Sequence, residues 1–118
     1  MKVVMVEPDK PAYTTEIGEG YKAIHDAVGG LIEPIYFLKE QGVVMVGNEE
    51  SKLLEMEGNR RFPEGIVAGT FIICGDNGED FCSLTDEQCE KYTQMFSQPH
   101  TITQDEVKQD TGITFITF

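Results

Sequence analysis

The hydrophobic residues of this 118-residue chain stand mostly in short runs interrupted by glycine and proline. A short apolar run between turn residues is typical of a buried β-strand, whereas a helix needs about ten residues with a 3.6-residue period. The runs predict strands at residues 3–6, 31–37, 43–46, 66–73 and 113–118. The chain is therefore expected to fold around a β-sheet.

Turn signals between the runs predict antiparallel pairing. Residues 13–17 alternate weakly and can pair with the first run. Asn77-Gly78 is a strong hairpin signal because both residues tolerate a positive φ, so Phe81-Cys82 is expected to return antiparallel. Pro34 has no amide hydrogen, and its strand is predicted to be an edge strand or to carry a bulge. Gly69 predicts a bulge or a close approach within residues 66–73.

Three segments carry helix signals. Apolar residues in segment 21–28 recur at i, i+3, i+4 and i+7, and Gly29-Gly30 ends that helix. Capping boxes beginning at Thr85 and Thr103 predict a second helix reaching residue 96 and a short third one ending near residue 110.

The order of elements predicts an α+β fold, a mainly antiparallel sheet with the two main helices packed on one face. The length fits a single domain over residues 1–118. The polar segment 47–62 matches no regular element. Long polar loops in compact domains often carry function.

Charge and composition exclude several classes of protein. The net charge is −12, and a nucleic-acid-binding domain needs a surplus of Lys and Arg to neutralise phosphates. No apolar run approaches the length of a membrane span, and the first apolar run is too short for a signal-peptide core. Three cysteines, an odd number, favour free thiols in a reducing cytoplasm. We expect a cytoplasmic protein without a metal or cofactor.

The acidic residues are concentrated in the second half of the chain. Residues 62–118 have a net charge of −8, against −4 for residues 1–61. Six of these acids fall between residues 76 and 90: Asp76, Glu79, Asp80, Asp86, Glu87 and Glu90. They are either a solvated surface with acids that favour a helix N-terminus, or an anionic face that docks on a basic partner.

The segment from residue 48 to residue 61 contains both arginines of the chain, Arg60 and Arg61. Arginine suits bidentate capture of carboxylate or phosphate. The same loop supplies further polar side chains: Asn48, Glu49, Glu50, Lys52 and Asn59. In one interpretation Glu49 or Glu50 pairs with Arg60 and holds the loop. In the other, the asparagines orient a ligand and Arg60 binds its anionic group.

Catalytic chemistry has little support in the sequence. Glu49 and Glu50 are adjacent, so on an extended strand they point in opposite directions. The acids at 76–80 lack the ligand order of a calcium loop, and Gly29-Gly30 follows a helix rather than a strand, unlike a dinucleotide-binding fingerprint. No local pattern joins a cysteine to a histidine. We expect a protein that is not an enzyme.

Three stretches carry a resemblance to a known family. They are Val28-Gly29-Gly30-Leu31-Ile32-Glu33, Gly47-Asn48-Glu49-Glu50-Ser51-Lys52-Leu53 continuing to Gly58-Asn59-Arg60, and Ile66-Val67-Ala68-Gly69-Thr70-Phe71. In this order and spacing the chain resembles the bacterial and phage family catalogued as domain of unknown function 3846, from about Met1 to Phe96. Ser51 stands where the family pattern has a glycine, so the turn after Glu50 is expected to differ.

The resemblance implies a family-like core of residues 1–98 and a C-terminal helix-strand addition at residues 99–118. It also implies the context of phages and mobile elements, without an established activity. We expect a non-enzymatic accessory protein that binds a host protein or a small anionic ligand through the 48–61 loop. The alternative is an acidic nucleic-acid mimic that inhibits a host nuclease or defence system with its 76–90 face.

Overall fold

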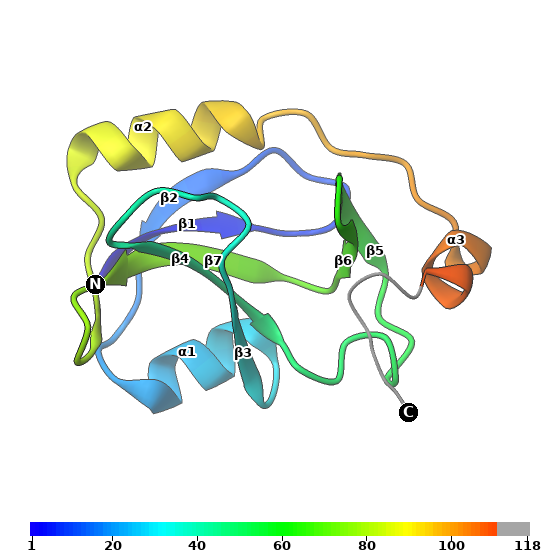
Figure 1. Ribbon diagram of the computed structural model, residues 1–118, viewed down its shortest axis with the longest axis horizontal. Coiled ribbons are helices and arrows are strands. Elements are labelled where there is room, and N and C mark those ends of the chain that lie inside the picture. Colours follow the sequence, from blue (N-terminus) through cyan, green and yellow to red (C-terminus); the bar gives the residue numbers. More distant parts are fainter. Residues whose placement is uncertain (111–118) are drawn as a thin grey trace.

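A mainly antiparallel sheet forms the centre of the molecule. The computed structural model describes residues 1–110, so the strand predicted at 113–118 lies outside the described residues. The sheet has the order β2-β1-β7-β4-β3, every pair is antiparallel, and β8 pairs with β7 (Figure 1). Its strands are β1 (Lys2–Val6), β2 (Tyr13–Glu16), β3 (Ile32–Ile35), β4 (Val43–Asn48), β7 (Phe71–Asp76) and β8 (Phe81–Cys82). The predicted α+β class is confirmed.

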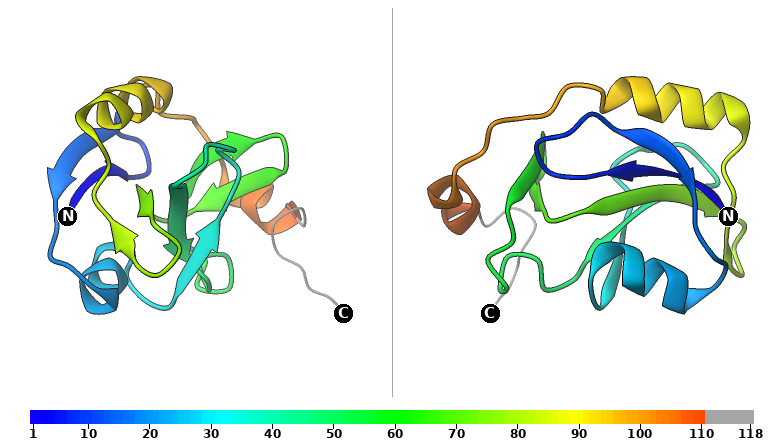
Figure 2. Two further views of the ribbon diagram at one scale, coloured as in Figure 1. Left: turned by 60° about the vertical axis from the view of Figure 1, so that its left-hand side comes forward. Right: turned by 180° about the vertical axis from the view of Figure 1, so that it is seen from behind.

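The two main helices cover opposite faces of this sheet. Figures 1 and 2 show α1 (Tyr21–Val28) on one side and α2 (Asp86–Met95) on the other. Val3 and Ile24 belong to the core beneath α1, whereas Val4 and Tyr92 belong to the core beneath α2. The prediction that both helices pack on one face is wrong. Neighbouring residues of β1 are buried on both faces of the sheet, and such a strand needs a cover on each side.

The apolar run at 66–73 forms two strands rather than one. Gly69 has a φ of 76° and separates β6 (Gly65–Ala68) from β7. A Cβ atom at Gly69 would lie 2.7 Å from Met56 Sδ, so only glycine fits without displacing that side chain. β6 pairs with β5 (Gly58–Phe62) in a separate two-stranded sheet. The segment 47–62, unassigned from sequence, thus contains the end of β4, a turn and β5.

Several local predictions are confirmed. The strand with Pro34 lies at the sheet edge, and α1 ends at Gly29, whose φ is 83°. Both capping boxes form, at Thr85 before α2 and at Thr103 before α3 (Gln104–Gln109). Ser51 has no positive φ, so the turn after Glu50 does not require the glycine of the family pattern. None of the helices in residues 1–110 is long and apolar enough to cross a membrane.

The segment that follows α2 packs against the two-stranded sheet. A Cβ atom on Gly58 would lie 2.5 Å from Ile102 Cγ2, so the backbone of β5 closely approaches this segment. Lys52 forms an ion pair with Asp110, whose Oδ2 also accepts from the backbone N–H of Ile66 at 2.9 Å. The described part of the predicted C-terminal addition therefore covers β5, β6 and the turn before them.

Glu40 links the β3–β4 connection to α2. Its carboxylate accepts hydrogen bonds from Tyr92 Oη, from Gln88 Nε2 at 3.1 Å and from Lys91 Nζ at 3.1 Å. These donors, Tyr92 first, hold the pKa of Glu40 below its ordinary value. A carboxylate with a lowered folded-state pKa stabilises the fold above its unfolded-state pKa, and this contribution is lost as the pH falls through the folded-state value.

We expect Glu40→Gln to lower the free energy of unfolding by about 1 kcal/mol at neutral pH, because it removes the charge that Lys91 and Tyr92 hydrogen-bond. The difference from wild type should shrink as the pH falls below the ordinary pKa of a glutamate and through the lower folded-state pKa of Glu40, because the wild-type carboxylate is then protonated as well. Urea unfolding at several pH values measures it. Glu87→Gln, at an exposed position on the same helix as Lys91, is the control. An equal pH-dependent loss in that control would contradict the prediction.

Candidate functional site

Arg60 is an internal structural residue. It is 1% exposed, and its Nη2 donates to Lys10 O at 2.7 Å and to Phe96 O at 2.8 Å. Its Nη1 donates to Asn59 Oδ1 at 2.7 Å and to Asn59 O at 3.2 Å. Phe96 is the C-cap of α2, where the helix dipole favours a cation. Burial lowers the pKa of Arg60. The guanidinium is thus directed inward, where an external anion has no access.

Asn59 is directed inward as well. It is fully buried, and its Nδ2 donates to Val6 O and Gly69 O, both at 2.9 Å. Asn48 is 4% exposed, donates to Val28 O at 3.3 Å, and accepts from the backbone N–H of Glu50 at 2.8 Å. Asn48 therefore fixes the end of α1, whereas Asn59 joins β5 to β1 and to Gly69 in the connection between β6 and β7.

The other members of the predicted loop site are dispersed. Glu49 is exposed, Glu50 is half-buried, and Lys52 is paired with Asp110. Arg61 donates to Glu106 Oε1 at 2.8 Å and does not join Arg60 in a fork. The prediction that the 48–61 loop gathers Asn48, Asn59 and Arg60 into an anion-binding site is wrong. The interpretation in which Glu49 or Glu50 pairs with Arg60 is wrong too, because within residues 1–110 the hydrogen bonds of Arg60 go to backbone and amide oxygens.

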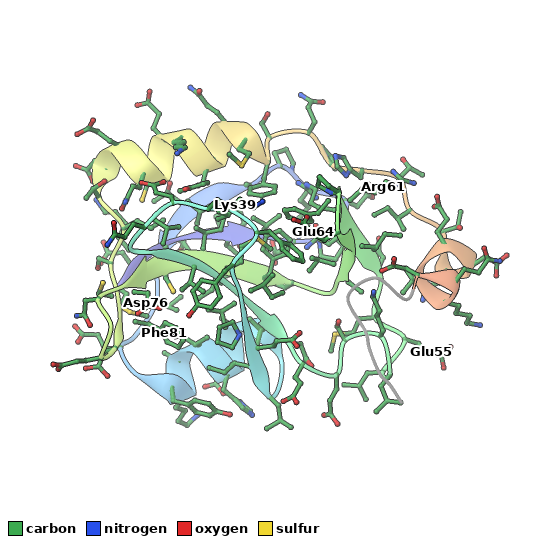
Figure 3. The ribbon with its side chains drawn as sticks, viewed as in Figure 1. Lys39, Glu55, Arg61, Glu64, Asp76 and Phe81 are labelled. Carbon is green, nitrogen blue, oxygen red and sulfur yellow. The ribbon has the colours of Figure 1, made fainter. Side chains whose placement is uncertain are left out.

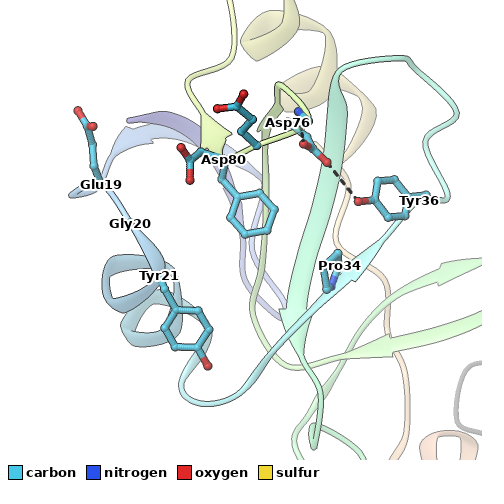
Figure 4. A pocket seen from close by; sticks show the side chains of 10 residues that line it. Glu19, Gly20, Tyr21, Pro34, Tyr36, Asp76 and Asp80 are labelled. Carbon is cyan, nitrogen blue, oxygen red and sulfur yellow. Dashed lines mark hydrogen bonds between the residues drawn. The ribbon is translucent and has the colours of Figure 1, made fainter.

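A pocket of about 630 Å³ lies at the other end of the molecule. Figure 3 shows Asp76 and Phe81 at this end and Arg61 at the opposite one. Three segments form its walls: the residues entering α1, the end of β3, and the β7–β8 turn (Figure 4). The lining residues are Glu19, Gly20, Tyr21, Pro34, Tyr36, Asp76, Gly78, Glu79, Asp80 and Phe81. Carboxylates and aromatic rings thus meet in one hollow.

Strand alternation explains why these side chains meet. β3 and β7 both flank β4, and successive side chains on a strand point to opposite faces. Ile72 and Ile32 belong to the core beneath α1. Asp76 follows Ile72 by an even number of residues, as Tyr36 follows Ile32, so Asp76 and Tyr36 face the same side of the sheet as these two isoleucines. Tyr36 Oη donates to Asp76 Oδ2 at 3.1 Å. The pKa of Tyr36 is raised, chiefly by partial desolvation of its hydroxyl group and secondly by this hydrogen bond.

The β7–β8 turn is ordered by its own side chains. Asp76 Oδ1 accepts from the backbone N–H of Gly78 at 2.9 Å, and Asn77 Oδ1 accepts from those of Glu79 and Asp80 at 3.0 and 2.9 Å. Such short side-chain bonds to following amides are a property of Asp and Asn in turns. The carboxylates of Glu79 and Asp80 consequently project from a defined backbone.

The pocket is strongly anionic. Within residues 1–110, the carboxylates of Glu19, Glu79 and Asp80 make no hydrogen bond or ion pair, and no lysine or arginine lines the walls. The rings of Tyr21 and Tyr36 are 54% and 61% exposed and stand on opposite sides of the hollow (Figure 4). Carboxylates beside exposed aromatic faces attract cations, because the face of an aromatic ring carries negative electrostatic potential.

The six acids of the predicted 76–90 face fall into two groups. Asp76, Glu79 and Asp80 line the pocket, whereas Asp86, Glu87 and Glu90 belong to α2, which covers the opposite face of the sheet. Asp86 is paired with Lys2 Nζ at 2.6 Å, and this contact lowers the pKa of Asp86. The first group is therefore combined with a hollow.

Two of the three cysteines are buried, and one of the two histidines is hydrogen-bonded to the backbone. Cys74 and Cys89 are buried, and burial raises the pKa of Cys74 to about 12. His100 Nδ1 accepts from the backbone N–H of Arg61 at 2.9 Å. Among residues 1–110 no group of three or more His, Cys, Asp or Glu side chains is arranged to hold a metal ion.

Sequence reasoning found three of the pocket acids and missed Glu19, Tyr21, Tyr36 and Phe81. They come from three separate segments of the chain, with Glu19 and Tyr21 in one of them, and show no shared motif. The even spacing of Tyr36 from Ile32 and of Asp76 from Ile72 is visible in the sequence. It predicts that the two side chains meet only once β3 and β7 are known to flank β4.

Comparison with known proteins identifies a family. A family model described as a domain of unknown function (DUF3846) matches residues 1–97. No curated protein and no solved structure matches the chain.

Proposed function

The chain belongs to the family described as a domain of unknown function (DUF3846), and we propose that it is a non-enzymatic accessory protein of a phage or mobile element that binds a basic host protein. The observation that carries the proposal is the pocket, in which carboxylates with no partner among residues 1–110 lie beside exposed aromatic rings. A net charge of −12 adds long-range attraction toward a basic partner. The proposed place of action is the bacterial cytoplasm.

The binding surface differs from the one expected from sequence. Burial of Asn59 and Arg60 removes the groups that would have bound a small anion. The acidic nucleic-acid mimic has less support, since its carboxylates are divided between the pocket and α2, and Asp86 is paired internally. Both proposals require a basic partner, so the experiment must separate them.

Affinity capture from bacterial lysate with charge-neutralised variants makes that separation. The pocket variant is Glu79→Gln/Asp80→Asn, and the matched control is Glu87→Gln/Glu90→Gln, which removes the same charge from α2. We expect a basic protein to be retained by wild type and by the control, to be lost from the pocket variant, and to be released between about 0.15 and 0.5 M salt, where screening is stronger.

Equal loss of the partner from both variants would favour the nucleic-acid mimic. A partner that remains on both variants, or that resists salt, would contradict binding through the acidic pocket.

A further inference from the structure

The size and walls of the pocket indicate which group of a basic partner it accepts. A volume of about 630 Å³ exceeds what a single ammonium ion fills, and three separate segments of the chain surround it. The hollow is open to solvent, so a side chain can enter while its backbone stays outside. We propose that the pocket holds the guanidinium of an arginine side chain that projects from the partner; this inference rests on the proposed function.

The aromatic walls are suited to a planar cation. The hydrogen bond from Tyr36 Oη to Asp76 at 3.1 Å orients the Tyr36 ring while leaving it 61% exposed. Tyr21 offers a second exposed ring from the first turn of α1, and Phe81 is the third aromatic residue of the lining. A guanidinium stacks flat on such rings and is less strongly hydrated than an ammonium.

The carboxylates supply the complementary charge. Glu19, Glu79 and Asp80 have no partner among residues 1–110, so an entering cation does not have to displace an internal ion pair. Carboxylates also match the forked N–H groups of arginine, whereas a lysine ammonium acts as a compact point charge. In a partly solvated hollow a lysine ammonium keeps most of its hydration shell, so it gains less binding free energy from the carboxylates and rings than a guanidinium does. The site should therefore prefer arginine to lysine.

Titration of the full chain with small probes tests this preference. The probes are Nα-acetyl-arginine amide, Nα-acetyl-lysine amide and Nα-acetyl-citrulline amide, the last being a neutral analogue of arginine. The amide resonances of Gly20 and Gly78, which line the pocket, report binding by NMR. We expect saturable shifts with the arginine probe at millimolar concentration, at least about threefold weaker binding of the lysine probe, and no shifts with citrulline.

Variants separate the aromatic ring from its hydroxyl group. Tyr36→Leu should weaken binding of the arginine probe about two- to fivefold, whereas Tyr36→Phe keeps the ring and should stay within about twofold of wild type. Tyr13→Leu is the matched control, because Tyr13 is an exposed tyrosine on β2 whose hydroxyl also donates to a carboxylate, Glu7, at 3.1 Å.

Three results would overturn the inference: citrulline binding as well as arginine, lysine binding as tightly as arginine, or equal weakening by Tyr13→Leu. Capture of a basic partner that depends on Glu79 and Asp80, without arginine-induced shifts at Gly20 and Gly78, would reject arginine insertion and leave the proposed function standing. If neither the capture that depends on Glu79 and Asp80 nor the arginine-induced shifts were observed, the proposed function would be rejected as well.

Discussion

Replacement of Arg60 by alanine is expected to lower the free energy of unfolding by about 3–5 kcal/mol. The guanidinium is 1% exposed and donates to Lys10 O, Phe96 O and two oxygens of Asn59. Alanine would remove a donor from each of these acceptors, although Phe96 O keeps the backbone N–H of Ala12 at 3.1 Å, and would open a cavity among the turn after β1, β5 and the end of α2. Small domains have only about 5–15 kcal/mol of stability in total, so the variant should be close to unfolding.

Urea unfolding followed by far-ultraviolet circular dichroism measures this loss, since the chain has no tryptophan. Arg61→Ala is the control from the next position. The Arg61 side chain is 46% exposed and its ion pair with Glu106 is on the surface, so its removal should cost less than about 1 kcal/mol. Similar losses in the two variants would show that Arg60 does not have the structural role assigned to it.

Replacement of Asn59 by alanine is expected to cost about 2–4 kcal/mol. The side chain bridges Val6 O and Gly69 O at 2.9 Å each and accepts from Arg60 Nη1 at 2.7 Å. Its loss would remove a donor from two carbonyls and an acceptor from a buried cation. The two-stranded sheet would then be less firmly attached to β1.

Asn48→Ala is the matched control for Asn59, because Asn48 is also buried but makes one short hydrogen bond, at 2.8 Å, and a longer one at 3.3 Å. Its cost should be at least about 1 kcal/mol smaller in the same urea experiment. If Asn48→Ala lowered the free energy of unfolding as much as Asn59→Ala or more, the larger structural role of Asn59 would be contradicted.

The burial of Asn59 and Arg60 explains why sequence reasoning placed the site wrongly. Two arginines, two asparagines and several charges in one polar stretch resemble a binding loop, and charged side chains are rarely buried completely. Nothing in the local sequence shows that the carbonyls of Lys10 and Phe96 lie where a guanidinium can reach both. Those acceptors are 50 and 36 residues away in the chain.

Local features were predictable because their causes are local. Glycine after α1, Pro34 at a sheet edge, Asn77-Gly78 between β7 and β8, and the two capping boxes each depend on the conformational or hydrogen-bonding properties of neighbouring residues. The antiparallel α+β class follows from these elements and their short connections.

The sequence by itself therefore determined most of the elements, their boundaries to within a few residues, and the acidic character of the second half, but it determined neither β5 nor the break between β6 and β7. The tertiary structure alone decided which face each helix covers, the inward direction of Arg60, and the meeting of Glu19, Tyr36 and Asp80 in one pocket. The physical reason is that element formation depends on residues a few positions apart, whereas strand order and packing bring together residues whose separation along the chain carries no signal of contact.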